Sequence, residues 1–140
     1  MRTTEEIIAF MKEHKIGSRE APKHVPLGVE ALLPDEEVLF AFCGNQNSHG
    51  LESQGIHAYL LTAQRLIVAQ GNIAFQKGNL RGVEVYPWNS VGGISYKKGF
   101  LTNTIIIHLP YGAGTIMVDK PGTLLIFNSL NEIRANALNA

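Results

Sequence analysis

The most strongly patterned stretch of the chain is a pair of apolar runs near its middle. Residues 58–61 and 66–69 are rich in Tyr, Leu, Ile and Val, and only residues 62–65 separate them. Such side chains fit a pleated, at least half-buried surface, and so short a break allows only a tight reversal. The pattern therefore predicts a β-hairpin over residues 58–70, with Thr62 and Arg65 fixing its turn.

Further strands are predicted on both sides of this hairpin. Residues 81–87 alternate with period two, which is typical of a half-buried antiparallel strand, and Trp88 follows as a large apolar anchor in a turn. With the hairpin, the predicted strands are residues 37–43, 58–62, 65–70, 81–87, 93–97, 102–109 and 115–119. Because short turns join these strands, the order indicates an antiparallel meander rather than parallel crossovers.

Two stretches have helical spacing instead. Thr3 and Glu6 have the spacing of a capping box, and apolar residues at three- and four-residue intervals then predict a helix over about residues 4–14, ended by Gly17. We expect its apolar stripe to dock on its own domain, with docking on a partner as the alternative. Residues 124–137 repeat the same spacing and predict a C-terminal helix of about four turns.

These elements predict one mainly β (α+β) domain: a seven-stranded, antiparallel, partly open barrel capped by a C-terminal helix, with an extra N-terminal helix. Residues 1–34 are assigned to the N-terminal helix and a connector, which has a short helical pattern at residues 28–33. Residues 35–140 form the barrel domain. Residues 44–55 are polar and glycine-rich, and we expect a long loop or hairpin tip there.

Composition and charge exclude several classes of function. Twelve basic and twelve acidic residues give no net charge to draw the protein onto nucleic acid, and no apolar run reaches the roughly 18 residues that span a membrane. The single Cys43 lies in an apolar run, which favours a buried thiol in a reducing compartment. With an N-terminus too acidic for a secretory signal, these features predict a cytoplasmic protein.

The candidate chemistry in the sequence is sparse. The five histidines have no metal-ligand spacing, although His49 and His57 could meet across a hairpin near Glu52. There is no phosphate-binding glycine motif, and no serine has a base at motif spacing. We therefore expect no metal, no cofactor and no enzymatic activity.

The order of elements and two local motifs resemble a known family. Leu61-Thr62-x-x-Arg65-Leu66 looks like the signature turn of bacterial PH-like domains, and residues 85–94 are similar to a hydrophobic-Pro-hydrophobic-x-x-Ile stretch of that family. The resemblance covers about residues 30–138, is strongest to the YokE-like branch, and implies the pleckstrin-homology superfold. Eukaryotic members hold phosphoinositides with Lys and Arg in the first hairpin loop. Here that loop has only His49 as a potential cation, so lipid binding is not carried over.

Two functional hypotheses follow. The first is a non-catalytic module that binds a partner protein or itself, through a strand edge or through a sheet face at Ile105, Ile106 and Ile107. Alternation turns either Ile106 or the pair Ile105 and Ile107 away from the barrel interior, unless the N-terminal helix covers that face. The second is a small-molecule or lipid-head-group binder that uses the barrel end at residues 44–55, with His49 and His57 as polar contacts. Lys97 and Lys98, at the tip of a later hairpin, are further candidates for ligand contacts. The alternative, which we favour, is a solvated turn with weak or no attraction to membranes.

Overall fold

The computed structural model describes residues 1–46, 55–71, 82–110 and 112–140. In chain order its main elements are α1 (Thr4–His14), α2 (Ala21–Glu30), β1 (Val38–Gln46), β2 (Gly55–Thr62), β3 (Arg65–Ala69), β4 (Val83–Pro87), β5 (Ile94–Lys97), β6 (Thr102–Leu109), β7 (Gly112–Asp119) and α3 (Thr123–Leu138). Two short 3-10 helices, η2 (Trp88–Ser90) and η3 (Lys120–Gly122), precede β5 and α3.

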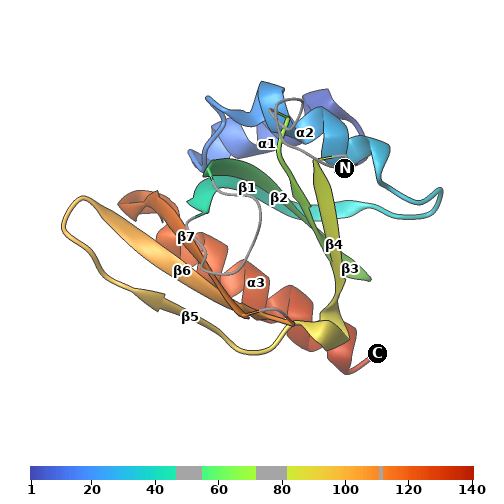
Figure 1. Cartoon of the computed structure of the whole chain (residues 1–140). Helices are drawn as coiled ribbons and strands as arrows, with labels where there is room; N and C mark the ends of the chain where they lie inside the picture. Colours follow the sequence, from blue (N-terminus) through green and yellow to red (C-terminus); the bar gives the residue numbers. More distant parts are fainter. Residues whose placement is uncertain (47–54, 72–81, 111) are drawn as a thin grey trace.

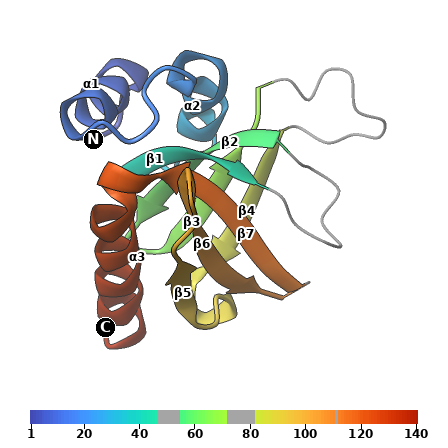
Figure 2. The same ribbon diagram turned by 90° about the vertical axis from the view of Figure 1, so that its left-hand side faces the viewer.

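The seven strands form one sheet with the order β4-β3-β2-β1-β7-β6-β5, and every pair in it is antiparallel. β1 pairs with β2 along its length but with β7 only at Asn45 and Gln46. The two halves of the sheet therefore join at one end of β1 and diverge elsewhere, and α3 lies between them (Figure 1, Figure 2). The predicted fold of seven antiparallel strands in an open sheet, with N- and C-terminal helices, is confirmed.

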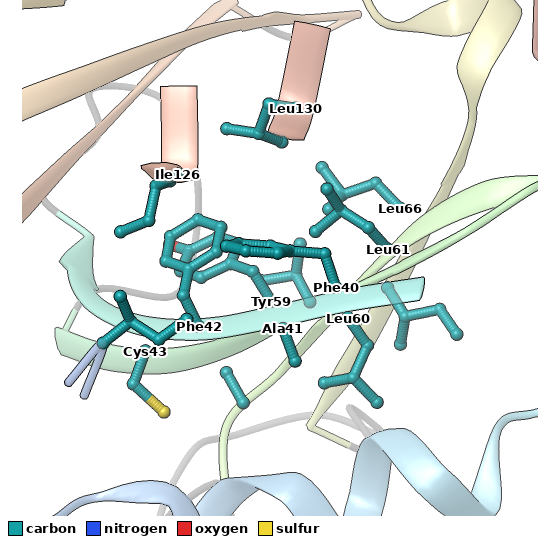
Figure 3. Packing of buried hydrophobic residues seen from close by; sticks show 14 of the residues in the cluster. Phe40, Ala41, Phe42, Cys43, Tyr59, Leu60, Leu61, Leu66, Ile126 and Leu130 are labelled. Carbon is teal, nitrogen blue, oxygen red and sulfur yellow. The ribbon is translucent and has the colours of Figure 1, made fainter. Parts of the chain in front are cut away.

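The middle of the sheet is buried on both faces (Figure 3). One set of side chains packs against Ile126 and Leu130 of α3 and comprises Phe40, Phe42, Tyr59, Leu61 and Leu66. The Phe42 and Tyr59 rings stack with centroids 4.7 Å apart. The opposite set, Ala41, Cys43 and Leu60, points toward the N-terminal helices. A strand buried on both faces reads as a continuous apolar run, and β1 and β2 have such runs.

The N-terminal helix begins as predicted. Thr3 caps it, with the Glu6 N–H donating to Thr3 Oγ1 and the Thr3 N–H donating to the Glu6 carboxylate, both over 3.1 Å. Ile7 and Met11 of α1 are fully buried. Together α1 and α2 cover the outer face of β1, β2 and β3 (Figure 2).

Several boundaries differ from the predictions. β2 begins at Gly55 rather than at residue 58, and β7 begins at Gly112 rather than at residue 115. Residues 21–30 form a full helix, α2, where we predicted a connector with a helical pattern only at residues 28–33. Pro22 and Pro26 obscured it, but Ala21, His24, Val25 and Gly28 share a buried face, and packing stabilises the helix. β1 also continues through Gly44 to Gln46, which we had placed in a loop. Residues 47–54 of that loop lie outside the described residues.

Candidate functional site

The segment between α1 and α2 forms one wall of a cleft. α1 ends at Lys15 in the left-handed conformation (φ 56°), and the Ile16 carbonyl accepts a 3.0 Å hydrogen bond from the Cys43 N–H of β1. Gly17 follows with φ 96°, where a Cβ would lie 2.8 Å from the Cys43 carbonyl oxygen. Only glycine fits this close approach, so the sequence at residues 15–17 fixes the segment to β1.

The floor of the cleft is the part of the outer sheet face that α1 and α2 leave uncovered. Asn45 pairs with Ile56 on one side and with Met117 on the other, and these three side chains therefore share one face of the sheet. Asn45 and Met117 are exposed, and Ile56 is half-buried. The row continues through Thr104 to Lys97 of β5.

The cleft between this wall and this floor has a volume of about 750 Å³. We call it the connector cleft, and its lining includes Lys12, Lys15, Gly17, Ser18, Arg19, Glu20, Cys43, Asn45, Ile56, Thr102, Met117 and Asp119. This lining carries three cations, Lys12, Lys15 and Arg19, and two carboxylates, Glu20 and Asp119. The Glu20 carboxylate lies 3.7 Å from the ammonium group of Lys23, which is not part of the lining. The floor of the connector cleft therefore carries the apolar side chains of Ile56 and Met117 on either side of the polar Asn45, and its rim has an excess of one positive charge.

The reactive groups around the connector cleft favour binding over catalysis. Burial, with the nearby charge of Glu20, raises the pKa of the Cys43 thiol to about 12, so the thiolate that would act as a nucleophile is not formed at neutral pH. Among the described residues that line the cleft, none is a histidine. Across the described ranges, no three His, Cys, Asp or Glu side chains come together in a way that could hold a metal ion.

The turn residues Thr62 and Arg65 lie far from this cleft and hold a buried carboxylate. Glu36 is 1% exposed and accepts bonds from Arg65 Nε (2.9 Å), Arg65 Nη2 (2.8 Å) and Thr62 Oγ1 (2.7 Å). Burial alone would raise the pKa of Glu36, but these bonds and the Leu33 N–H lower it to about 2. The Trp88 indole N–H donates to the Thr62 carbonyl over 2.8 Å. This cluster ties β1, the β2–β3 turn and η2 together.

His57 does not face the connector cleft. Its side chain is 2% exposed, and its Nδ1 lies 2.8 Å from the Gly55 carbonyl oxygen. His57 pairs with Gly44 of β1, so its side chain lies on the sheet face opposite that of Asn45. The strand pleat turns the His57 side chain inward, and its expected role as a polar contact at the barrel end stays a prediction. His49 and Glu52 lie outside the described residues.

A second buried imidazole, His24, was not singled out in the sequence. It is 1% exposed, and its Nδ1 accepts a 2.8 Å bond from the Gly71 N–H. Burial and the nearby His57 lower its pKa, and burial also lowers the pKa of His57. The apolar spacing of α2 was the signal that could have found it, since His24 occupies a core position there.

These two histidines predict a loss of stability in mild acid. Their folded pKa values lie below the ordinary 6.5, so the unfolded chain binds protons first and stability is complete only above that value. Below 6.5 the free energy of unfolding should fall by up to about 1.4 kcal/mol per pH unit for each neutral histidine. Urea titrations at several pH values between 6.5 and 4.5 would measure this slope. H24Q should reduce this slope, whereas H108Q, which replaces an exposed histidine, should leave it unchanged. A flat wild-type profile would contradict the prediction.

The predicted apolar face at residues 105–107 is corrected. Ile105 and Ile107 are 0% and 1% exposed and belong to the core, so they cannot contact a partner. Only Ile106 lies on the outer face, half-buried, and α1 and α2 cover β1–β3 rather than this strand. Period-two alternation places Ile106 on one face of the strand and Ile105 and Ile107 on the other, but the sequence did not show which face packs against α3.

Lys97 and Lys98 are both exposed at the β5–β6 tip, as a solvated turn requires. The two apolar residues that follow Gly99 were not among the predicted site residues. Phe100 and Leu101 are 92% and 80% exposed. Their signal was present, since two large apolar residues directly follow a Lys-Lys-Gly turn.

An open seven-stranded antiparallel sheet with one C-terminal helix between its halves defines a PH-like fold. The profile of the family described as "Bacterial PH domain" matches residues 32–123, so the chain belongs to that family. The crystal structure of the C-terminal domain of an unknown protein from Leishmania infantum is similar, with a TM-score of 0.53 and 10% identity over 71% of this chain and 85% of that one. This likeness concerns the fold alone. A search of the curated proteins found no match.

α1 and α2 precede the residues that the family profile matches. The helical wall of the connector cleft is therefore built by a segment outside the matched region, whereas the floor belongs to the family domain. Among the helices that the structure describes, none is both long and apolar enough to cross a membrane.

Proposed function

We propose that this chain is a non-catalytic interaction module that binds an acidic segment of a partner protein in the connector cleft. The observation that carries the proposal is the cleft itself, about 750 Å³ with an apolar floor at Ile56 and Met117 and a cationic rim. That volume lies in the range of ligand sites, roughly 300–1,000 Å³. Lys12, Lys15 and Arg19 supply charge complementary to Asp or Glu, and the floor accepts aliphatic side chains.

Several features support the non-catalytic part of this proposal. The Cys43 thiol is buried with its pKa raised to about 12, and PH-like domains are commonly interaction modules. The free Cys43 also supports placing the protein in a reducing compartment such as the cytoplasm. The Leu61-Thr62-x-x-Arg65-Leu66 turn supports placing it in the YokE-like branch of its family.

A second candidate is the binding of a small molecule or lipid head group at the barrel end. The connector cleft touches Gly44 and Asn45, which lie within the segment 44–55 that we predicted as a ligand-binding loop, and Ile56, which follows it. The cationic rim would also suit a small anion. Self-assembly is a third outcome, in which an acidic segment of a second copy fills the same cleft.

A peptide-display selection tests the proposal. We expect the wild-type protein to enrich peptides that combine Asp or Glu with Leu, Ile or Val. The triple variant K12E/K15E/R19E should bind those peptides at least tenfold more weakly, because reversed charges face the acidic groups. The variant K97E/K98E/K120E makes the same change in net charge outside the cleft lining and should bind them normally.

Three results would contradict the proposal: no enrichment, enrichment of uncharged peptides only, or equal binding by both triple variants. A thermal-shift screen with phosphorylated small molecules and nucleotides tests the second candidate in parallel. A ligand at a hundred times its Kd would add about 2.7 kcal/mol of stability. Light scattering over a range of protein concentrations identifies self-assembly.

A further inference from the structure

The β5–β6 tip presents large apolar side chains to solvent. Phe100 and Leu101 are 92% and 80% exposed, the two highest values among the large apolar residues that the structure describes. The tip projects at one end of the molecule (Figure 1). Solvent-exposed aromatic and aliphatic side chains gathered at one place mark a contact surface rather than a packing need.

Buried hydrogen bonds hold this tip in place. The Gly99 N–H donates to Asn103 Oδ1 over 3.1 Å, and Asn103 Nδ2 donates to Thr123 Oγ1 over 3.0 Å. Thr123 is 1% exposed at the first position of α3, and its hydroxyl donates to the Asp119 carbonyl. A Cβ on Gly99 would lie 2.2 Å from the Thr102 carbonyl oxygen, so the turn needs glycine. The exposed side chains therefore stand on a turn that is tied to α3.

Positive charge surrounds the same end of the molecule. Lys97, Lys98 and Lys120 are exposed, and in the described residues none of the three forms an ion pair. Leu124, in the first turn of α3 beside Thr123, is 57% exposed. The segment between α2 and β1, at the other end of the view in Figure 1, carries the exposed carboxylates Asp35 and Glu37. Asp119, which pairs with Thr102, places one exposed carboxylate beside these three lysines, so the tip keeps a net positive charge although the chain as a whole has none.

We propose that the β5–β6 tip docks this domain on an anionic lipid bilayer. Phe100 and Leu101 insert at the level of the lipid head groups, and the ammonium groups of Lys97 and Lys98 lie against the lipid phosphates. The site differs from the first hairpin loop and from the connector cleft. Two projecting side chains on a convex turn cover far less than the roughly 800 Å² per partner of a stable protein interface, which favours a bilayer over a protein.

Vesicle co-sedimentation tests this proposal with the full chain. We expect binding to vesicles of phosphatidylcholine mixed with phosphatidylglycerol, weak binding to phosphatidylcholine alone, and release by salt. K97Q/K98Q should weaken binding about 25-fold, at roughly fivefold for each charge removed. F100S/L101S should abolish it. L33S removes a leucine of 53% exposure from the opposite end and should change nothing.

The variant F100W gives a direct reading of insertion. The only native tryptophan, Trp88, is 2% exposed, so it contributes a constant signal. A tryptophan at position 100 should shift its emission to the blue with anionic vesicles and be quenched by brominated lipid. The proposal is overturned if wild type does not sediment with anionic vesicles at low salt, or if F100S/L101S binds as wild type does. It is also overturned if the tip variants abolish only a protein dimer seen by light scattering. All tip residues are exposed, and thermal unfolding confirms that each variant is folded.

Discussion

Replacing Arg65 by alanine should lower the free energy of unfolding by roughly 3–5 kcal/mol, because it leaves the Glu36 carboxylate buried without its cation. Glu36 is 1% exposed, and Arg65 supplies two of its hydrogen bonds, at 2.8 and 2.9 Å. Urea denaturation at neutral pH measures the loss. R19A removes an exposed guanidinium and should stay within about 0.5 kcal/mol of wild type. A cost below about 1 kcal/mol for R65A would show that the pair does not hold the turn.

The same pair sets a second, more acidic range of pH dependence. The folded pKa of Glu36 is lowered from 4.5 to about 2, so the unfolded chain takes up the proton first as the pH falls. Above pH 4.5, Glu36 makes its full contribution to the free energy of unfolding, roughly 3 kcal/mol. This contribution is lost as the pH falls from 4.5 to about 2. R65A should lose much of this dependence. The range lies below that of His24 and His57, so the two effects can be separated in one series of titrations.

The second large effect concerns the N-terminal helices. A fragment of residues 35–140 should fail to unfold cooperatively, although it contains all seven strands and α3. It lacks Ile7, Met11 and Val25, each of which is fully buried, and burial of each contributes roughly 2 kcal/mol. It would also expose Leu60 on the outer face of β2. The loss is comparable to the whole stability of a typical domain, about 5–15 kcal/mol.

Circular dichroism during thermal unfolding and the dispersion of amide NMR signals would test this expectation. A longer fragment, residues 4–140, lacks only the cap and the terminal contacts near β1; it serves as the control and should stay folded. A cooperative transition for residues 35–140 would contradict the prediction. It would also show that residues 35–140, the predicted barrel domain, fold without residues 1–34.

The fold was predictable because its elements have unambiguous periods. The apolar runs of β1 and β2, the capping box at Thr3 and the three-and-four spacing of α3 each indicate one type of element. α2 was missed because Pro22 and Pro26 are poor helix formers in general, yet Pro22 lies at the helix start, where its absent N–H costs nothing. Packing against β2 and β3 compensates for Pro26.

The candidate site was much less predictable. The cations of the connector cleft come from residues 12–19, and the floor comes from β1, β2 and β7, so their proximity depends on how α1 docks on the sheet. A single sequence contains no signal for that docking. Likewise, alternation separates Ile105 and Ile107 from Ile106 but does not say which face meets α3. The partner of Arg65 was predictable only as a carbonyl or a carboxylate, because Glu36 lies 29 residues away in the sequence.

The most direct test of the proposed function is an NMR titration of the full chain with a peptide from the display selection. We expect the amide signals of Gly17, Ser18, Asn45 and Met117 to shift together and to saturate, because these residues line the connector cleft. The signals of Gln64 and Arg65, at the far turn, should stay in place. Shifts confined to that turn or to the β5–β6 tip, or no saturable shifts in the cleft, would contradict the account.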